Sequence, residues 1–318
     1  MSRSPTALIT GSNGFVGRWL SEYLISYNYA VTGIDLQSEA VDKTLSYHQL
    51  DISSVNEAAS LITKLQPDTI FHLAGVTFLP QADKSPRTSL ESNISAVLTL
   101  LETIKEYSPS TRLICIGSAK EYSDSIFSDG ISEKVPPQPT NFYGISKYAG
   151  ELIALQYFRQ FGISVFCTRS FNHTGPRQSP RFVCSDWARQ VARVSLGLAE
   201  PFITVGDLNA TIDFTDVRDV VKAYHLIVEK GQPGEVYNVC SGNGIALSWI
   251  LNYLCDKAPC SIAVQYVESK LRKHRTNKKM IGNNRKLTRH TGWVPTIPLQ
   301  QTLDEMYDYW VQELKKQQ

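Results

Sequence analysis

The stretch ALITGSNGFVGRWLSEYL, residues 7–24, joins an apolar, strand-like run to a helix-like segment through three glycines. Glycines at this spacing allow a tight turn, and they let a pyrophosphate approach the backbone N–H groups at the positive end of a helix. The alternative is a turn that needs its glycines for packing alone. We favour a dinucleotide site, with contacts from Gly11, Asn13, Gly14, Phe15, Val16 and Gly17.

From this stretch onward, β-rich runs alternate with helical segments through the first half of the chain. The runs are TALIT, AVTGID, TIFHLA, RLICIG and SVFCTRS, and helices are predicted over about 15–26, 54–65, 89–106 and 143–161. Apolar strands separated by helices indicate a parallel sheet with right-handed crossovers. The predicted fold class is α/β, with a Rossmann-type doubly wound parallel sheet.

After Arg169 the alternation gives way to loops rich in glycine and proline. We expect residues 1–170 to form a dinucleotide-binding domain, to which part of 211–256 returns. Residues 171–210 and 257–318, with helices near 185–197 and 299–315, are expected to form a smaller, irregular α/β lobe. Such a lobe would lie over the carboxyl ends of the strands, where open parallel sheets bind ligands.

Bulk composition argues against several classes of protein. The 318 residues carry 32 basic and 30 acidic side chains, which gives no global signal for nucleic acid or a membrane surface. Residues 270–289 hold nine Lys and Arg and no acid, but they lack the interleaved aromatic residues of a stacking platform. The six cysteines form no CxxC pair, and no apolar stretch approaches ~18 residues. We expect reduced thiols, a soluble cytoplasmic protein, no metal site and no nucleic-acid or membrane partner.

An acidic residue, Asp35, ends the second predicted strand, 18 positions after Gly17. A carboxylate at this point accepts hydrogen bonds from both ribose hydroxyls of NAD and repels the 2′-phosphate of NADP. NAD(H) is therefore the preferred cofactor, with NADP(H) possible, although a turn-capping role would also explain this aspartate. Residues at the ends of the third and fourth strands could touch adenine and pyrophosphate: Asp51, Ile52, Leu73, Ala74 and Gly75.

The segment YGISK places Tyr143 and Lys147 four residues apart, on one face of a predicted helix. An unperturbed tyrosine, with a pKa near ~10, exchanges protons poorly at neutral pH, and an adjacent ammonium stabilises its phenolate. Such a pair often lies on a solvated helix face without any function. Ser118, at a predicted strand end 25 residues earlier, favours a catalytic set of Ser118, Tyr143 and Lys147.

These motifs together resemble the extended short-chain dehydrogenase/reductase family over nearly the whole chain. The resemblance implies that Tyr143 is the general acid/base and that Lys147 binds the nicotinamide ribose and lowers the pKa of the tyrosine. It implies that Ser118 hydrogen-bonds the reacting oxygen. Asn93 matches a family asparagine that supports the site.

Later motifs resemble the nucleotide-sugar branch of that family, and within it the GDP-4-keto-6-deoxy-D-mannose reductases. They are TRSFNHTGPRQSPRFV, DFTDVRDVVKAY, VYNVCSG and TGWVPTIPLQQTL. A nucleotide-sugar substrate is therefore expected. The resemblance implies substrate contacts from Ser118, Tyr143, Asn172, Phe182, Val183, Arg189 and Arg272. Thr77 and Lys120 are further candidates for substrate contact, Lys120 although it departs from the family pattern.

The segment GSAKEYS, residues 117–123, departs from the family's dehydratases and also from its reductases, which keep a glutamate at the position of Lys120. The corresponding segment of the dehydratases carries a carboxylate two places before the tyrosine, and that carboxylate removes the proton next to the 4-keto group. Here Lys120 occupies that place, and a charged ammonium cannot abstract a proton. Glu121 could supply the carboxylate only if the strand end were shifted by one residue. A second departure is Ile212, where relatives place an arginine against the diphosphate; Arg177, Arg181 or the basic stretch 270–289 could compensate.

We therefore expect an NAD(P)H-dependent reductase of a nucleotide-linked 4-keto-6-deoxyhexose, and the resemblance implies GDP as the nucleotide. The alternatives are a nucleotide-sugar 4-epimerase with tightly bound NAD and a non-catalytic nucleotide-binding protein. The resemblance also implies a homodimer formed through the helices at 89–106 and 143–161. Apolar residues on the first of these helices fit such a surface or a buried core: Leu90, Ile94, Val97, Leu98 and Leu101.

Overall fold

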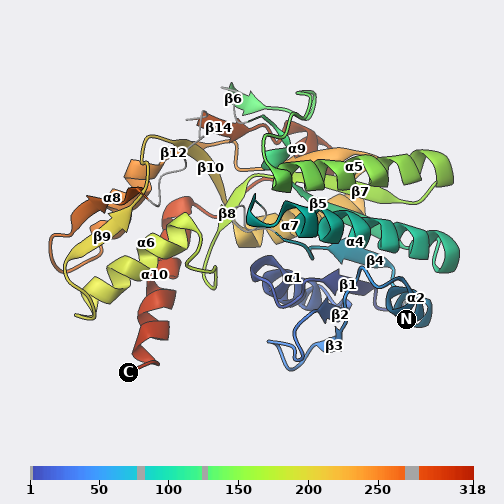
Figure 1. The fold of residues 1–318 in the computed structure, drawn as a ribbon, viewed down its shortest axis with the longest axis horizontal. Helices are drawn as coiled ribbons and strands as arrows, with labels where there is room; N and C mark the ends of the chain where they lie inside the picture. The colour runs from blue at the N-terminus through green and yellow to red at the C-terminus, as the bar shows by residue number, and fades with distance from the viewer. Residues whose placement is uncertain (1–2, 77–82, 124–127, 269–278) are drawn as a thin grey trace.

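The computed structural model describes residues 3–76, 83–123, 128–268 and 279–318. Its central sheet is built from β1 (Thr6–Thr10), β2 (Ala30–Asp35), β3 (Ser46–Gln49), β4 (Thr69–His72), β5 (Arg112–Ser118), β7 (Val165–Ser170) and β11 (Val236–Val239). The seven strands are all parallel, in the order β11-β7-β5-β4-β1-β2-β3 (Figure 1). Six of them follow the order of a doubly wound dinucleotide-binding sheet. The predicted fold class is confirmed.

Helices cover both faces of this sheet. One face carries α2 (Val55–Leu65), α4 (Pro86–Tyr107) and α5 (Phe142–Phe161), and the other carries α1 (Phe15–Ser26), α7 (Val217–Lys230) and α9 (Arg285–Thr291). Side chains of β1 alternate between the two layers: Ala7 and Ile9 pack with α1 and α7, whereas Leu8 packs with α2 and α4. Burial on both faces explains why the strand sequences are almost continuously apolar.

A smaller lobe lies beyond the carboxyl ends of the strands, on the left in Figure 1. Its helices are α6 (Val183–Ser195), α8 (Leu247–Cys255) and α10 (Leu299–Lys315). They enclose a separate core that includes Trp187, Ile250 and Met306. Its strands are β6 (Ser128–Ile131), β8 (Asn172–Thr174), β9 (Phe202–Val205), β10 (Thr211–Asp216), β12 (Gly244–Ala246), β13 (Ala263–Tyr266) and β14 (Lys279–Gly282). They form a sheet in the order β12-β10-β14-β6, with β8 beside β10, and a separate β13-β9 pair.

Two helices show how the later spans of the chain are divided between the central sheet and the lobe. The span 211–256 returns α7 and β11 to the central sheet, but α8, from the same span, packs against α6 in the lobe. Conversely, α9 belongs to the span 257–318 yet packs against α7 and β11. The chain thus returns from the lobe to the central sheet, where α9 packs beside the edge strand β11. The domain boundaries themselves stay a prediction.

Part of the apolar surface expected on α4 lies inside the chain. Val97 and Leu101 belong to the core shared with α5, while Leu98 is 37% exposed. The homodimer stays a prediction. All six cysteines are free thiols. Among the described residues, no helix is both long enough and apolar enough to cross a membrane.

Candidate active site

A cleft of about 1200 Å³ separates the carboxyl edge of the central sheet from the lobe. One wall consists of the ends of β1, β2, β4 and β5 with the start of α5, and the other of β8, the loop after it and the start of α6. Because the order of the strands reverses between β1 and β4, the cleft lies at the switch point where such sheets bind ligands. Its volume suits a ligand larger than a single sugar.

The glycine turn between β1 and α1 forms the deep end of this cleft. Gly11 has a φ of +74°, and a Cβ atom on it would lie 3.0 Å from the backbone N of Ala74. A Cβ atom on Gly17 would lie 2.3 Å from the carbonyl oxygen of Gly11. Only glycine fits at either position, so the first turn of α1 comes close against β1 with its N–H groups toward the cleft. Gly14, Phe15 and Val16 also line the cleft.

Asn13, from the same motif, turns its side chain away from the cleft. Its Nδ2 donates to the carbonyl oxygen of Glu39 at 2.9 Å, and its Oδ1 accepts from the backbone N of Val41 at 2.9 Å. Asn13 therefore fastens the loop that follows β2. Only its backbone remains near the turn, where its N–H donates to Asp35 at 3.1 Å.

Asp35 and the other strand-end residues converge on the cleft. The Asp35 carboxylate also accepts from the backbone N of Leu36 at 2.8 Å, which fixes its position at the end of β2. Five more predicted cofactor residues line the same wall: Asp51, Ile52, Leu73, Ala74 and Gly75. The predicted cofactor residues are thus adjacent in space, with the side chain of Asn13 as the exception.

Asn93 supports this wall from α4. Its Oδ1 accepts from the backbone N of Val76 at 2.8 Å, and its Nδ2 donates to Ser146 Oγ at 2.8 Å. These bonds tie the loop after β4 to α5, because Val76 and Ser146 belong to those two elements. The buried side chain of Asn93 therefore has the supporting place that the resemblance implied.

Ser118, Tyr143 and Lys147 meet on the sheet wall. Ser118 is the last residue of β5, and α5 begins beside it under an Asn141 cap that accepts from the backbone N of Gly144 at 2.8 Å. The side chain of Ser118 hydrogen-bonds the Tyr143 hydroxyl, and all three residues line the cleft. Burial raises the pKa of Tyr143 to about 12, and the bond from Ser118 opposes this shift. The direction is opposite to the lowering expected from Lys147.

Lys120 and Glu121 point to opposite sides of the turn after β5, the 3-10 helix η1 (Ala119–Glu121). Lys120 lines the cleft, whereas Glu121 is 0% exposed and its carboxyl accepts from the backbone N of Ser118 at 2.7 Å. The strand end is therefore not shifted, and Glu121 does not take the place of the missing carboxylate in the cleft.

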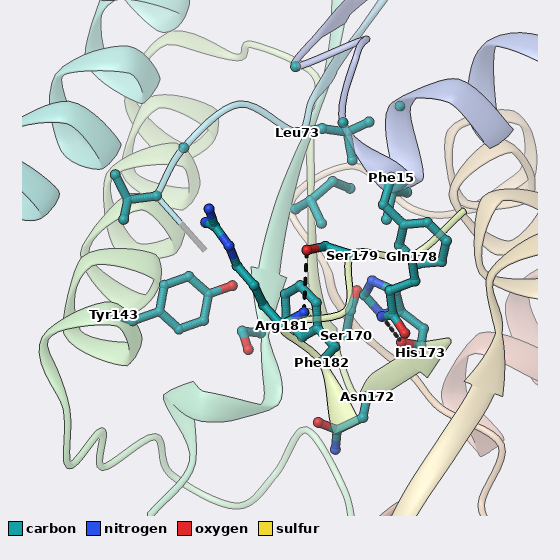
Figure 2. Close-up of a pocket in the computed structure, with 18 of the residues that line it drawn as sticks. Phe15, Leu73, Tyr143, Ser170, Asn172, His173, Gln178, Ser179, Arg181 and Phe182 are labelled. Carbon is teal, nitrogen blue, oxygen red and sulfur yellow. Dashed lines mark hydrogen bonds between the residues drawn. The ribbon is translucent and has the colours of Figure 1, made fainter. Parts of the chain in front are cut away.

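The lobe wall brings Asn172, Phe182 and Val183 to the cleft as expected. Figure 2 shows the side chain of Arg181, from the loop before α6, extending into the cleft on the side where the ring of Tyr143 enters. Arg177 instead pairs with Glu22 at the surface. The cation with access to the cleft from this loop is therefore Arg181.

Three predicted substrate residues do not lie in the described cleft. Arg189 stacks its guanidinium on the ring of Trp310, 5.6 Å from the ring centre, because its place on α6 directs it toward α10. Arg189 therefore does not line the cleft as the structure describes it. Thr77 and Arg272 lie outside the described residues.

Several cleft residues were not among the predicted site residues, although they lie in motifs quoted from the sequence: Ser170 and His173 in TRSFNHTGPRQSPRFV, and Tyr224 in DFTDVRDVVKAY. Ser170 Oγ and the hydroxyl of Tyr224 are 2.8 Å apart at the end of β7, and His173 stacks on Phe15 with ring centres 6.3 Å apart (Figure 2). Tyr224 lies on α7. The amphipathic pattern of this helix predicts that it packs on the sheet, but the pattern does not indicate which of its residues reaches the cleft. The strand-end position of Ser170 and the two motifs were the signals that could have identified these residues.

The whole chain is similar to proteins that act on nucleotide sugars. A sequence model of the family described as GDP-mannose 4,6 dehydratase matches residues 8–306. A GDP-6-deoxy-D-mannose reductase from Pseudomonas aeruginosa is 32% identical over 97% of this chain and 98% of its own.

Solved structures give the same picture of the fold. The structure of RMD from Pseudomonas aeruginosa complexed with NADPH superposes with a TM-score of 0.87 at 31% identity, covering 98% of this chain and 100% of that one. A UDP-glucose 4-epimerase from Thermotoga maritima, solved with UDP-glucose, has a TM-score of 0.88 at 25% identity, covering 97% of this chain and 99% of that one.

Proposed function

The chain belongs to the GDP-mannose 4,6 dehydratase family, and we propose that it reduces the 4-keto group of a nucleotide-linked 4-keto-6-deoxyhexose, with GDP as the preferred nucleotide. One observation carries the proposal. Ser118 and Tyr143 are hydrogen-bonded on the wall of a cleft that also contains Lys147 and, at its other end, the glycine turn.

The residues of the sheet wall fit a dinucleotide. The absence of side chains at Gly11 and Gly17 leaves the first turn of α1 open to a pyrophosphate, and the Asp35 carboxylate is placed for ribose hydroxyls. A bound reduced nicotinamide supplies the hydride. Relatives have been solved with NADPH and with NAD, and Asp35 favours NAD(H) here.

The proton has a natural source in Tyr143. A phenol with a pKa near ~10 is protonated at neutral pH, and burial, which raises the pKa of Tyr143 to about 12, keeps it so. Reduction needs a protonated donor beside the carbonyl oxygen, whereas oxidation of an alcohol needs a base. Ser118 would share the same oxygen and hold the carbonyl in line with the phenol.

Dehydration fits these residues poorly. Lys120 lines the cleft where a dehydratase of this family carries its carboxylate, and Glu121 is turned away from it. Proton abstraction next to the keto group therefore has no carboxylate base on this turn.

The lobe wall would hold the nucleotide diphosphate. The wall opposite the glycine turn is lined by Asn172, Phe182 and Val183. The side chain of Arg181 extends into the cleft from the loop before α6 (Figure 2). Ile212 gives that wall an apolar side chain in place of the arginine of relatives. We assign the compensating contact to Arg181, because the guanidinium can form charge-assisted hydrogen bonds to phosphate oxygens.

The proposal is tested by offering the purified protein 4-keto-6-deoxyhexoses linked to GDP, UDP, dTDP and CDP, with NADH or NADPH. We expect fastest nicotinamide oxidation with the GDP sugar and no 4-keto product from GDP-mannose with NAD or NADP. Release of a 4-keto product from GDP-mannose would contradict it. Stoichiometric NAD retained through purification, without net oxidation of added NADH, would instead support a 4-epimerase.

A further inference from the structure

Directly behind Ser118, on the side away from the cleft, two carboxyls surround one cation. Glu121, Glu151 and Arg169 are all buried, with exposed fractions of 0%, 4% and 4%. They come from η1, α5 and β7, so the cluster joins the helix that carries Tyr143 and Lys147 to the turn directly after Ser118 and to the strand next to β5. Two acids and one guanidinium leave one negative charge in excess if both acids are ionised.

The hydrogen bonds of Arg169 are used by Glu151 and Tyr122. Its Nε and Nη2 donate to the two carboxyl oxygens of Glu151 at 2.9 and 2.6 Å, and its Nη1 donates to the hydroxyl of Tyr122 at 3.0 Å. Glu151 therefore has the bidentate geometry of an ionised partner. Glu121 lies farther off, with its Oε2 3.5 Å from Arg169 Nε.

Glu121 Oε2 accepts no hydrogen bond from any described residue, although it is buried. Its other oxygen, Oε1, accepts from the backbone N of Ser118. An ionised carboxylate with one bare oxygen in such a place is costly, whereas a protonated carboxyl can donate from that oxygen. Both acids lie around Arg169 Nε, which is 2.9 Å from Glu151 Oε2 and 3.5 Å from Glu121 Oε2, so Glu151 is the carboxyl that can receive the proton.

We propose that Glu121 is a protonated positioning residue, whose neutral carboxyl holds the backbone of Ser118 from behind and donates its proton to Glu151. The same cluster then contains one ionised acid and one cation, with no excess charge. Burial and the neighbouring charge of Glu151 both raise the pKa of Glu121 well above its usual value. The inference rests on the proposed function only where it takes Ser118 to be a catalytic residue.

The position of Ser118 is sensitive to this support. Its backbone N is fixed by Glu121, its Oγ accepts from the backbone N of Lys120 at 3.2 Å, and the same side chain bonds Tyr143. Gly117 makes the approach possible, since a Cβ atom there would lie 2.3 Å from Glu121 Oε1. Loss of the proton would place a negative charge behind Tyr143, and this charge raises the tyrosine pKa.

Other titratable groups also face Glu121. Helix α5 contributes Tyr143, Lys147 and Glu151. Strand β7 contributes Arg169 and Cys167, and Tyr122 follows Glu121 in the chain. Lys147 and Arg169 favour the ionised form, whereas burial and Glu151 favour the protonated form. The charge of Glu121 is therefore set by the balance between these neighbours.

Glu121→Gln is the decisive variant, because an amide keeps the acceptor for Ser118 and supplies a permanent donor to Glu151. We expect infrared spectroscopy at neutral pH to show a protonated-carboxyl C=O band in the wild type that Glu121→Gln lacks. The control Glu91→Gln, which removes an exposed carboxylate on α4, should keep that band. Absence of the band from the wild type would overturn the proposal.

Thermal stability gives a second measurement that needs no substrate. A glutamate with a raised folded-state pKa stabilises the protein fully below its unfolded pKa, about 4.3, and loses that contribution as the pH rises through the folded value. The Tm of Glu121→Gln should therefore rise relative to wild type as the pH increases above that point. A relative Tm that falls as the pH rises would indicate an ionised carboxylate with a lowered pKa and would overturn the proposal.

Turnover completes the test. Glu121→Gln should keep kcat close to wild type, while Glu121→Ala, which leaves the Ser118 N–H without its acceptor, should lose roughly 10- to 100-fold in kcat. Equal loss in both variants would contradict the neutral carboxyl. If Glu121→Ala fails to fold, the glutamine variant still decides. If the protein reduces no keto sugar, the infrared and Tm results stand by themselves.

Discussion

The two walls of the cleft are built by different means. On the sheet wall, the glycine turn and the ends of parallel strands offer backbone groups and fixed strand-end side chains, held by bonds such as those of Asn93. On the lobe wall, Arg181 and Phe182 extend from a loop into the space opposite (Figure 2). The difference suggests that the sheet wall carries the chemistry common to the family, and that the lobe wall selects the substrate.

The largest expected effect comes from the sheet wall. Tyr143→Phe should lower kcat by roughly 10²–10⁴-fold, because the variant loses the proton donor. The substrate KM should change little, since the hydroxyl is one polar contact among many. Steady-state kinetics measure both. Tyr157→Phe, on the same helix but bonded to Glu102 at the surface, is the matched control. An unchanged kcat in Tyr143→Phe would show that Tyr143 is not the proton donor and would contradict the catalytic role of the sheet wall.

A change on the lobe wall should affect binding more than turnover. Arg181→Ala removes a charge-assisted contact worth about 1.5–3 kcal/mol, which is roughly 10- to 150-fold in the KM of the nucleotide sugar. Arg189→Ala is the matched control, because Arg189 lies on the ring of Trp310 outside the cleft. A larger loss in the control than in Arg181→Ala would reverse the assignment of the diphosphate contact.

The smallest expected effect concerns the choice of cofactor. The wild type should prefer NADH to NADPH, because the Asp35 carboxylate repels a 2′-phosphate. Asp35→Ser should shift the ratio of kcat/KM for the two cofactors about tenfold toward NADPH, or about 1.4 kcal/mol. Asp42→Asn, in the exposed loop after β2, should leave the ratio unchanged. A tenfold preference of the wild type for NADPH would contradict the role of Asp35.

The sheet wall could be predicted from sequence because its features are local. Gly11 and Gly17 belong to one turn, and Ser118 and Asp35 end strands whose apolar runs are evident. Parallel strands end at the same edge of a sheet, so residues far apart in sequence were expected to meet there. Those residues do line one cleft.

The lobe wall and the back of the site were harder to predict. Whether Arg181 or Arg189 faces the cleft depends on where α6 begins and how it rotates against α10, and a loop sequence fixes neither. The side of η1 to which Glu121 points likewise depends on Arg169 and Glu151, which are distant in the chain. Tertiary packing sets the direction of such side chains, and a short sequence motif does not predict that direction.

Isotope transfer tests the central claim most directly. The protein is incubated with GDP-4-keto-6-deoxy-D-mannose and NADH carrying deuterium at the transferable position of the nicotinamide, and the sugar product is examined by NMR. A reductase places one deuterium at C4 of each product molecule, which is the expected result. A product without deuterium at C4, or conversion without net oxidation of the nicotinamide, would contradict the account.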